Sequence, residues 1–170
     1  YDTLAMSVLA ILLAGIGALL TFMFGAHNVM LGELSPHSKW KSRMVFVSVR
    51  ASWAFVRSVP ELVWALMIIF ILSPGILPGA IALAIHNYGV LGRLASEAVE
   101  GMDTSPARAL RSSGAGRMQL LLYGVLPQAL PHFMTYLLYR WEVVIRTTVV
   151  VGIVAAGGMG MEFSLSHIHI

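Results

Sequence analysis

The sequence predicts an all-α, polytopic membrane protein with one domain, residues 1–170, and about five transmembrane helices. Hydrophobic residues make up 58% of the chain and charged residues 11%, whereas soluble domains carry about 25% charged residues. A chain of this length cannot bury so much apolar surface in a water-facing fold, so the lipid bilayer is its expected solvent. Cysteine is absent, which excludes disulfide and thiol chemistry.

The first two apolar segments are residues 4–24 and 44–72. The first is long enough to cross a bilayer core of about 30 Å. Gly15 and Gly17 in its middle favour close helix packing. The second segment contains Pro60 and several charged residues, so we expect an interfacial helix that leads into a spanning one.

The third, fourth and fifth segments are residues 80–94, 118–139 and 147–163. A turn with two prolines and two glycines, residues 73–79, precedes the third and carries no basic residue. Basic residues instead gather in the two other loops, which the positive-inside rule assigns to the cytoplasm. They are Lys39, Lys41, Arg43, Arg93, Arg108, Arg111 and Arg117.

Residues 103–117 form the second basic loop, and their pattern predicts a short cytoplasmic helix. Ser105 is a favourable N-cap, Pro106 a favourable first helical residue and Gly114 a favourable stop. A helix of about two turns is marginal in isolation, so either the membrane domain or a docked soluble partner must hold it. Without a partner, the segment is an ordinary surface helix.

Polar side chains recur at helical spacing through the fourth segment and beyond it. Intervals of three and four residues place them in one stripe on an unbroken helix, and polar groups at membrane depth tend to face a protein interior or a water-filled path. The alternative is hydrogen bonding between helices together with a Glu142–Arg146 pair. The stripe consists of Gln128, His132, Thr135, Tyr139, Glu142 and Arg146.

A second charged pattern precedes Pro60. Arg43, Arg50 and Arg57 follow at intervals of seven residues, and Glu61 stands four further on. On a helix these residues share one face. That face is either a snorkelling interfacial stripe or an electropositive lining at the inner mouth of a pathway, to which Arg57 and Glu61 belong.

The loop and the start of the fourth segment resemble the cytoplasmic coupling motif of permease subunits in binding-protein-dependent ABC importers. Two positions depart from that motif. Arg108 stands where the family usually has Glu, and Gly124 stands where it usually has an aliphatic residue. The matching positions are Ala109, Gly114, Leu126 and Pro127.

Further segments are similar to the phosphonate-type branch of that family, so the resemblance covers nearly the whole chain. We expect the chain to be truncated at both ends relative to the family. The similar segments are residues 57–65, 86–92, 125–133, 139–148 and the glycine-rich 152–160.

The resemblance implies a permease subunit of a bacterial ABC importer in the inner membrane, with the five-helix core of the methionine-importer type. Its substrate would be phosphonate or a related oxyanion such as phosphite or phosphate. From the residues themselves, Arg146 is the first candidate to attract the oxygens of such an anion and Arg140 the second. The partners of the subunit would be a second permease copy, an extracytoplasmic substrate-binding protein and two ATPase subunits that hold ATP and Mg, with no cofactor in this chain. The ATPase contact would involve Ser105, Arg108, Ala109, Arg111, Gly114, Leu126 and Pro127.

Two other functions stay open, a permease for another small solute and a non-transporting membrane scaffold or channel. An enzyme is not expected, because the chain has neither a phosphate-binding loop nor a Gly-x-Ser-x-Gly motif. No nucleic-acid partner is expected either. His167 and His169 are too few to form a metal site.

Overall fold

The computed structural model describes the backbone of residues 2–32, 39–72 and 75–166, and the side chains of residues 3–32, 40–72 and 75–151. The described residues form helices and no strand. The all-helical class expected from the composition is confirmed. The elements are α1 (Asp2–Gly25), α2 (His27–Met30), α3 (Lys39–Ser58), α4 (Glu61–Leu72), α5 (Ile76–Gly101), α6 (Ser105–Ser112), α7 (Arg117–Gln119), the π-helix η1 (Leu120–Val125) and α8 (Leu126–Ser166).

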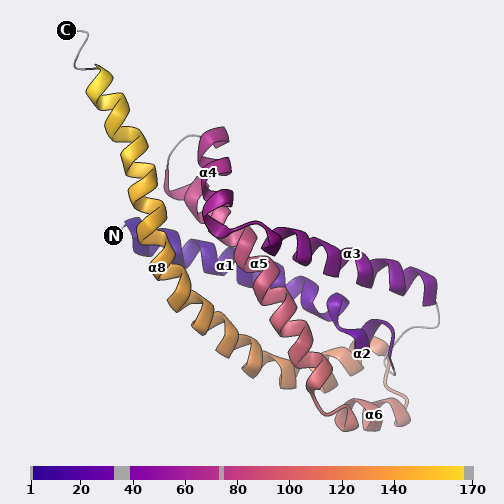
Figure 1. Cartoon of the computed structure of the whole chain (residues 1–170). Helices are drawn as coiled ribbons and strands as arrows, with labels where there is room; N and C mark the ends of the chain where they lie inside the picture. The colour runs from indigo at the N-terminus through magenta and orange to yellow at the C-terminus, as the bar shows by residue number, and fades with distance from the viewer. Residues whose placement is uncertain (1, 33–38, 73–74, 167–170) are drawn as a thin grey trace.

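Helix α5 is the centre of the bundle, and α1, α3, α4 and α8 all pack against it (Figure 1). Small residues make these close contacts possible. A Cβ atom on Gly15 of α1 would lie 2.5 Å from Leu137 Cδ1 of α8, and one on Gly17 would lie 3.1 Å from Tyr88 Cδ2 of α5. The close packing predicted for these two glycines is therefore confirmed.

Trp53 joins α3 to the other two inner helices. Its side chain is 1% exposed, and its indole ring occupies the space that side chains at two glycines would need. A Cβ atom on Gly25 of α1 would lie 2.1 Å from Trp53 Cη2, and one on Gly92 of α5 would lie 2.5 Å from Trp53 Cε2. The ring thus fixes the separation of three helices.

The second apolar segment forms two helices, α3 and α4, which meet at an angle of 87°. Pro60 precedes α4 and its carbonyl accepts the N–H of Val63 at 2.9 Å, so proline separates the two helices as expected. The carbonyl groups at the end of α3 find side-chain donors: Trp64 Nε1 donates to the Val56 carbonyl at 2.9 Å. Such donors satisfy groups that the helix end leaves without partners.

Helix α8 contradicts one detail of the prediction, because the fourth and fifth segments belong to a single continuous helix. Its 41 residues correspond to about 60 Å, twice the thickness of a bilayer core. Charged side chains interrupt the apolar pattern in residues 140–146, but this segment contains neither glycine nor proline. Two of the charged side chains, Glu142 and Arg146, form an ion pair along the helix. The helix therefore continues where hydropathy alone divides it.

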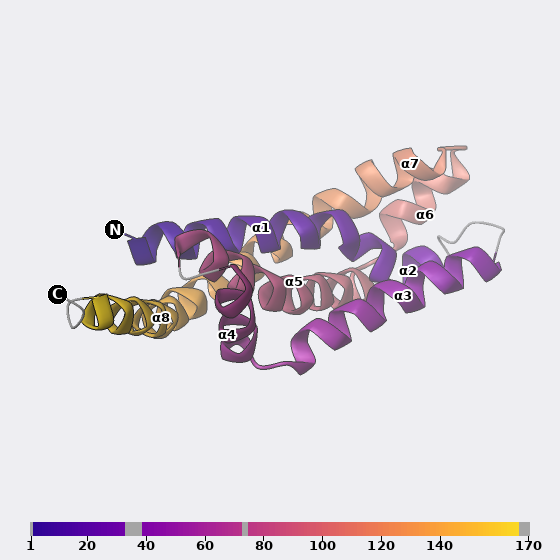
Figure 2. The same cartoon turned by 90° about the horizontal axis from the view of Figure 1, so that it is seen from above.

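Among the described residues, α1 is long and apolar enough to cross a membrane alone, and the bent pair α3–α4 meets the same criterion jointly. Large apolar side chains face outward, with Phe70 of α4 93% exposed and Leu20 of α1 68% exposed. Figure 2 shows α2, the beginning of α3, α6 and α7 at one end of the bundle, and the beginnings of α1 and α5 toward the other. The two basic loops thus share one end, as the charge pattern predicts.

Candidate functional site

Helix α6 is the loop helix that the sequence predicts, with a start displaced by one residue. Thr104 is the N-cap and Ser105 the first helical residue, so the prediction of Ser105 as N-cap is wrong. The reason is Asp103, whose Oδ1 accepts hydrogen bonds from Ser105 N at 2.9 Å and Ser105 Oγ at 2.7 Å. These bonds lower the pKa of the Asp103 carboxyl.

The end of α6 is closed by Gly114, whose φ angle is +85°. The Gly114 N–H donates to the Arg111 carbonyl at 3.1 Å, and the Ala115 N–H donates to the Leu110 carbonyl at 3.1 Å. These two bonds form a Schellman motif, which needs a left-handed residue at this position. The predicted stop at Gly114 is confirmed.

Helix α6 packs closely against η1 where Ala107 meets Gly124, and we call this contact the seam. Ala107 is 2% exposed, and a Cβ atom on Gly124 would lie 3.1 Å from Ala107 Cα. Gly124, which departs from the aliphatic residue of the coupling motif, thus lets the two helices touch. The sequence reasoning missed Ala107, although its position one turn from Leu110 on the apolar side of α6 was a visible signal.

The remaining predicted coupling residues lie outside this seam. Arg108, Ala109 and Arg111 are exposed, and Arg108 Nη2 donates to Ser105 Oγ at 3.2 Å. Leu126 is half-buried and Pro127 exposed where η1 passes into α8. Pro127 has no N–H to offer the carbonyl four residues earlier, and the π-helix lies at this point.

The predicted polar stripe lies along α8, and the bonds of Gln128, Thr135, Glu142 and Arg146 reach groups four residues away along the chain. Gln128 Nε2 donates to the Gly124 carbonyl at 2.7 Å, and Thr135 Oγ1 to the Pro131 carbonyl at 3.0 Å. Glu142 and Arg146 form an ion pair whose side chains are 64% and 75% exposed. His132 and Tyr139 are also exposed, so the stripe forms part of the outer surface of the single chain.

A polar junction joins α4, α5 and α8; we define it as Glu61, Asn87, Arg140 and Thr147. Asn87 is completely buried, and its Nδ2 donates to Glu61 Oε1 at 3.0 Å. Its Oδ1 accepts two bonds from Arg140, at 2.9 Å from Nε and 2.6 Å from Nη2. Thr147 Oγ1 lies 3.4 Å from Glu61 Oε1. Sequence reasoning found Glu61 but missed Asn87, whose signal was an amide inside an apolar segment.

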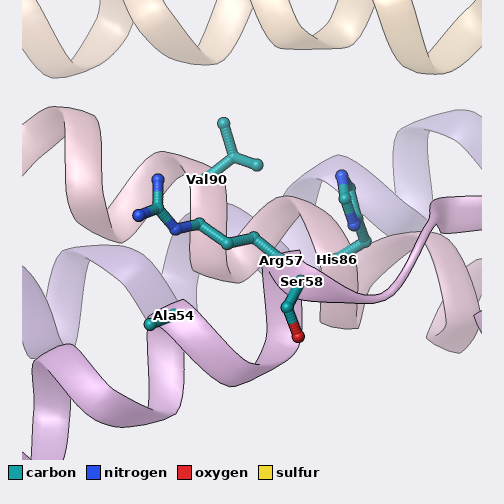
Figure 3. A pocket seen from close by; sticks show the side chains of 5 residues that line it. All are labelled: Ala54, Arg57, Ser58, His86 and Val90. Carbon is teal, nitrogen blue, oxygen red and sulfur yellow. The ribbon is translucent and has the colours of Figure 1, made fainter.

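The arginines of α3 do not form one continuous lining. Arg50 is half-buried and bonds Glu100 Oε1 of α5 at 2.6 Å, whereas Arg43 is exposed. Arg57 lies in a shallow open pocket with Ala54, Ser58, His86 and Val90. Figure 3 shows the Arg57 guanidinium turned toward Val90 and away from His86. The structure brings Glu61 to α8 but does not bring Arg57 to the stripe.

No group of His, Cys, Asp or Glu side chains within the described ranges has metal-site geometry. His167 and His169 lie outside the described residues. Together, these features define an all-helical bundle with a short polar helix at one end.

Comparison with known proteins identifies its family. The chain belongs to the family described as the binding-protein-dependent transport system inner membrane component, which matches residues 29–168.

Three relatives are named as permease proteins for phosphorus oxyanions. The phosphite transport system permease protein PtxC of Stutzerimonas stutzeri is 38% identical over 161 residues, which are 95% of this chain and 55% of that protein. The phosphate-import permease protein PhnE of Mycolicibacterium smegmatis is 36% identical over 94% of this chain and 28% of its own length. The putative cryptic phosphonate transport system permease protein PhnE2 of Escherichia coli is 48% identical over 48% of this chain and 66% of that protein.

Solved structures agree on the fold. The inward-facing MetNI methionine ABC transporter matches with a TM-score of 0.78 over 91% of this chain and 71% of that chain, at 19% identity. An amino acid ABC transporter solved with histidines matches with a TM-score of 0.70 over 89% of this chain and 68% of that chain. At this identity the likeness establishes the ABC importer permease fold. The chain spans 55% of PtxC and 28% of the mycobacterial PhnE.

Proposed function

We propose that this chain is a permease subunit of an ABC importer that moves phosphonate, phosphite or phosphate across the bacterial cytoplasmic membrane. The observation that carries the proposal is α6, a polar helix whose first residue bonds Asp103, whose end is closed at Gly114, and which the Ala107–Gly124 seam holds to its own chain. The names of the relatives supply the substrate class.

In this function α6 docks on a nucleotide-binding subunit, and two such subunits supply ATP and Mg. Local bonds at both ends give α6 a fixed shape before docking, which lowers the ordering cost of the contact. Its exposed face carries Arg108 and Arg111, so the complementary groove would be acidic or rich in carbonyl oxygens. An extracytoplasmic binding protein delivers the substrate from the opposite end.

The coupling role is tested by Gly114→Val in the assembled complex. A β-branched residue at φ +85° is strained by about 1–2 kcal/mol, which disrupts the end of α6. We expect loss of the ATPase subunit on purification, or ATP hydrolysis without transport. Gly101→Val is the matched control, because a Cβ atom there meets nothing within 4 Å and the φ angle is not left-handed. Normal assembly and transport in Gly114→Val would contradict the coupling role.

A second copy of the chain would cover the α8 stripe. In a single chain its exposed polar side chains face lipid, which is costly, whereas a two-fold axis along α8 would bury them between copies. Residues 1–170 contain no cysteine, so Tyr139→Cys introduces the only thiol in this part of the protein. We expect Tyr139→Cys to form a disulfide-linked permease dimer in membranes, and Leu20→Cys on the outer face of α1 to form none. Absence of a crosslink together with labelling of the introduced thiol from lipid would contradict a dimer through this face.

The substrate class is tested by uptake into proteoliposomes that contain the permease, its ATPase and its binding protein. We expect ATP-dependent uptake of methylphosphonate, phosphite or phosphate, and none of methionine. Uptake of an uncharged solute alone would instead favour a permease for another small solute. No uptake by a complete, ATP-hydrolysing complex would favour the scaffold.

A further inference from the structure

The arginine side chains of α3, α5 and α8 differ in whether a carboxylate pairs with them directly. Among the described residues, three of them pair with a carboxylate, and these pairs are Arg50–Glu100, Arg93–Glu97 and Arg146–Glu142. Arg57 and Arg140 make no ion pair within the part of the chain that the structure describes. Arg57 is exposed at the end of α3, whereas Arg140 is half-buried.

Asn87 holds the Arg140 guanidinium in one orientation. Its Oδ1 receives Arg140 Nε and Nη2, and its Nδ2 donates to Glu61 Oε1 and, at 2.7 Å, to the Leu83 carbonyl. All four hydrogen bonds that an amide side chain can form are therefore in use. The other N–H groups of Arg140 have no hydrogen-bond partner among the described residues, and they are oriented before any ligand arrives.

One carboxylate shares the junction with Arg140. The Glu61 carboxylate bonds Asn87 and Thr147 and makes no direct bond to the Arg140 guanidinium, so the two charges attract each other across the Asn87 amide and the unused N–H groups of Arg140 still have no acceptor in the described part of the chain. Leaving the donors of a half-buried guanidinium without an acceptor is costly. A guanidinium with free N–H groups is suited to an anion with several oxygens, because it forms short charge-assisted bonds to it.

We infer that Arg140, positioned by Asn87, binds the transported tetrahedral oxyanion inside the permease. The inference rests on the proposed function and names the residue that carries its substrate class. Arg146, the cation that the sequence favours, is a weaker candidate because the Glu142 carboxylate bonds its guanidinium directly. A phospholipid headgroup has the same chemistry as a free oxyanion, so the test distinguishes the two.

The direct test measures binding of methylphosphonate by the permease–ATPase complex in nanodiscs, without the binding protein that otherwise dominates affinity. Broadening of the methylphosphonate ³¹P resonance reports binding, and this resonance is separate from those of phospholipids. We expect Arg140→Gln to weaken methylphosphonate binding at least about tenfold, and Arg140→Lys to weaken it less. Arg93→Gln removes the same charge from an exposed pair and should leave binding within about twofold.

Several results would overturn the inference. Unchanged binding in Arg140→Gln is one, and equal losses in Arg140→Gln and Arg93→Gln are another. If Arg140→Gln does not assemble, Arg140→Lys decides, because an assembled lysine variant that binds supports the charge role and one that does not bind refutes it. Methylphosphonate binding that disappears when anionic phospholipid replaces zwitterionic phospholipid would assign Arg140 to a lipid headgroup instead.

Uptake by the wild-type complex separates this inference from the proposed function. If the wild-type complex imports methylphosphonate while Arg140→Gln binds and imports it equally well, the inferred binding site at Arg140 is wrong but the proposed import function is supported. If the wild-type complex imports no tetrahedral oxyanion, both are wrong.

Discussion

Helix α6 and the polar junction both consist of hydrogen-bonded polar side chains, but they bond over very different sequence distances. At α6 the aspartate and serine side chains bond groups two to four positions away, as between Asp103 and Ser105. In the junction the bonds join residues far apart, since 53 positions separate Asn87 from Arg140 and 86 separate Glu61 from Thr147. The first region fixes the shape of one helix, and the second fixes the positions of three helices. Substitutions in the junction should therefore cost more stability.

The largest effect is expected for Asn87→Leu. It leaves Arg140 and Glu61 without their shared amide, and removing one member of a partly buried charged network costs about 3 kcal/mol. The measurement is equilibrium unfolding in mixed detergent micelles. Gln128→Leu is the matched control, because the Gln128 amide donates to a carbonyl only four residues earlier in the chain, and the substitution should lower the free energy of unfolding by about 1 kcal/mol or less. Equal losses in the two variants would remove the distinction between local and long-range bonds.

A smaller effect is expected for Gly124→Val, which tests the contact between α6 and η1. The new side chain meets the Ala107 backbone at 3.1 Å, and overpacking of this kind costs about 1–3 kcal/mol. We expect α6 to separate from η1, so that trypsin cleaves after Arg108 and Arg111 faster than in the natural protein. Gly116→Val is the control, since the nearest atom to a Cβ there is Gln119 Oε1 at 3.7 Å. Unchanged cleavage in Gly124→Val would mean that something else holds α6.

The smallest effect is expected for the Glu142–Arg146 pair. Both side chains are mostly exposed, and exposed pairs at this spacing contribute about 0.3–0.5 kcal/mol. Arg146→Ala should therefore lower the free energy of unfolding by no more than this amount. It should also slow oxyanion uptake less than Arg140→Gln does. Adding Glu142→Ala should restore the uptake that Arg146→Ala loses. Uptake that stays impaired in the stable double variant would instead assign Arg146 a direct electrostatic role.

Local sequence patterns predicted the parts of the fold that local physics decides. The break at Pro60, the stop at Gly114 and the packing glycines of α1 depend on the backbone preferences or size of single residues. The N-cap was displaced because Asp103, two residues before Ser105, supplies the acceptor. The separation of the fourth and fifth segments failed because hydropathy counts charges, whereas a helix persists through charges that pair along its own surface.

The candidate site was harder to predict, because its geometry depends on contacts between distant segments. The stripe on α8 and the Glu142–Arg146 pair both follow from spacing and were found. Spacing does not reveal the partner of Arg140, because Asn87 lies 53 positions earlier in another helix. The three helices that bring Asn87 between Glu61 and Arg140 are themselves positioned by packing that no local pattern encodes.

The Trp53 ring between Gly25 and Gly92 limits how this bundle can change during evolution. The gap at either glycine is closed by the same ring, so a methyl group at position 25 or 92 collides with Trp53 unless the tryptophan is lost as well. The Trp53 Nε1 is buried with no hydrogen-bond partner among the described residues, so shape rather than bonding retains the ring. Positions 25, 53 and 92 are therefore expected to change together during evolution. Homologues with alanine at either glycine position should carry a smaller residue at position 53, and a substitution at only one of the three positions should be rare.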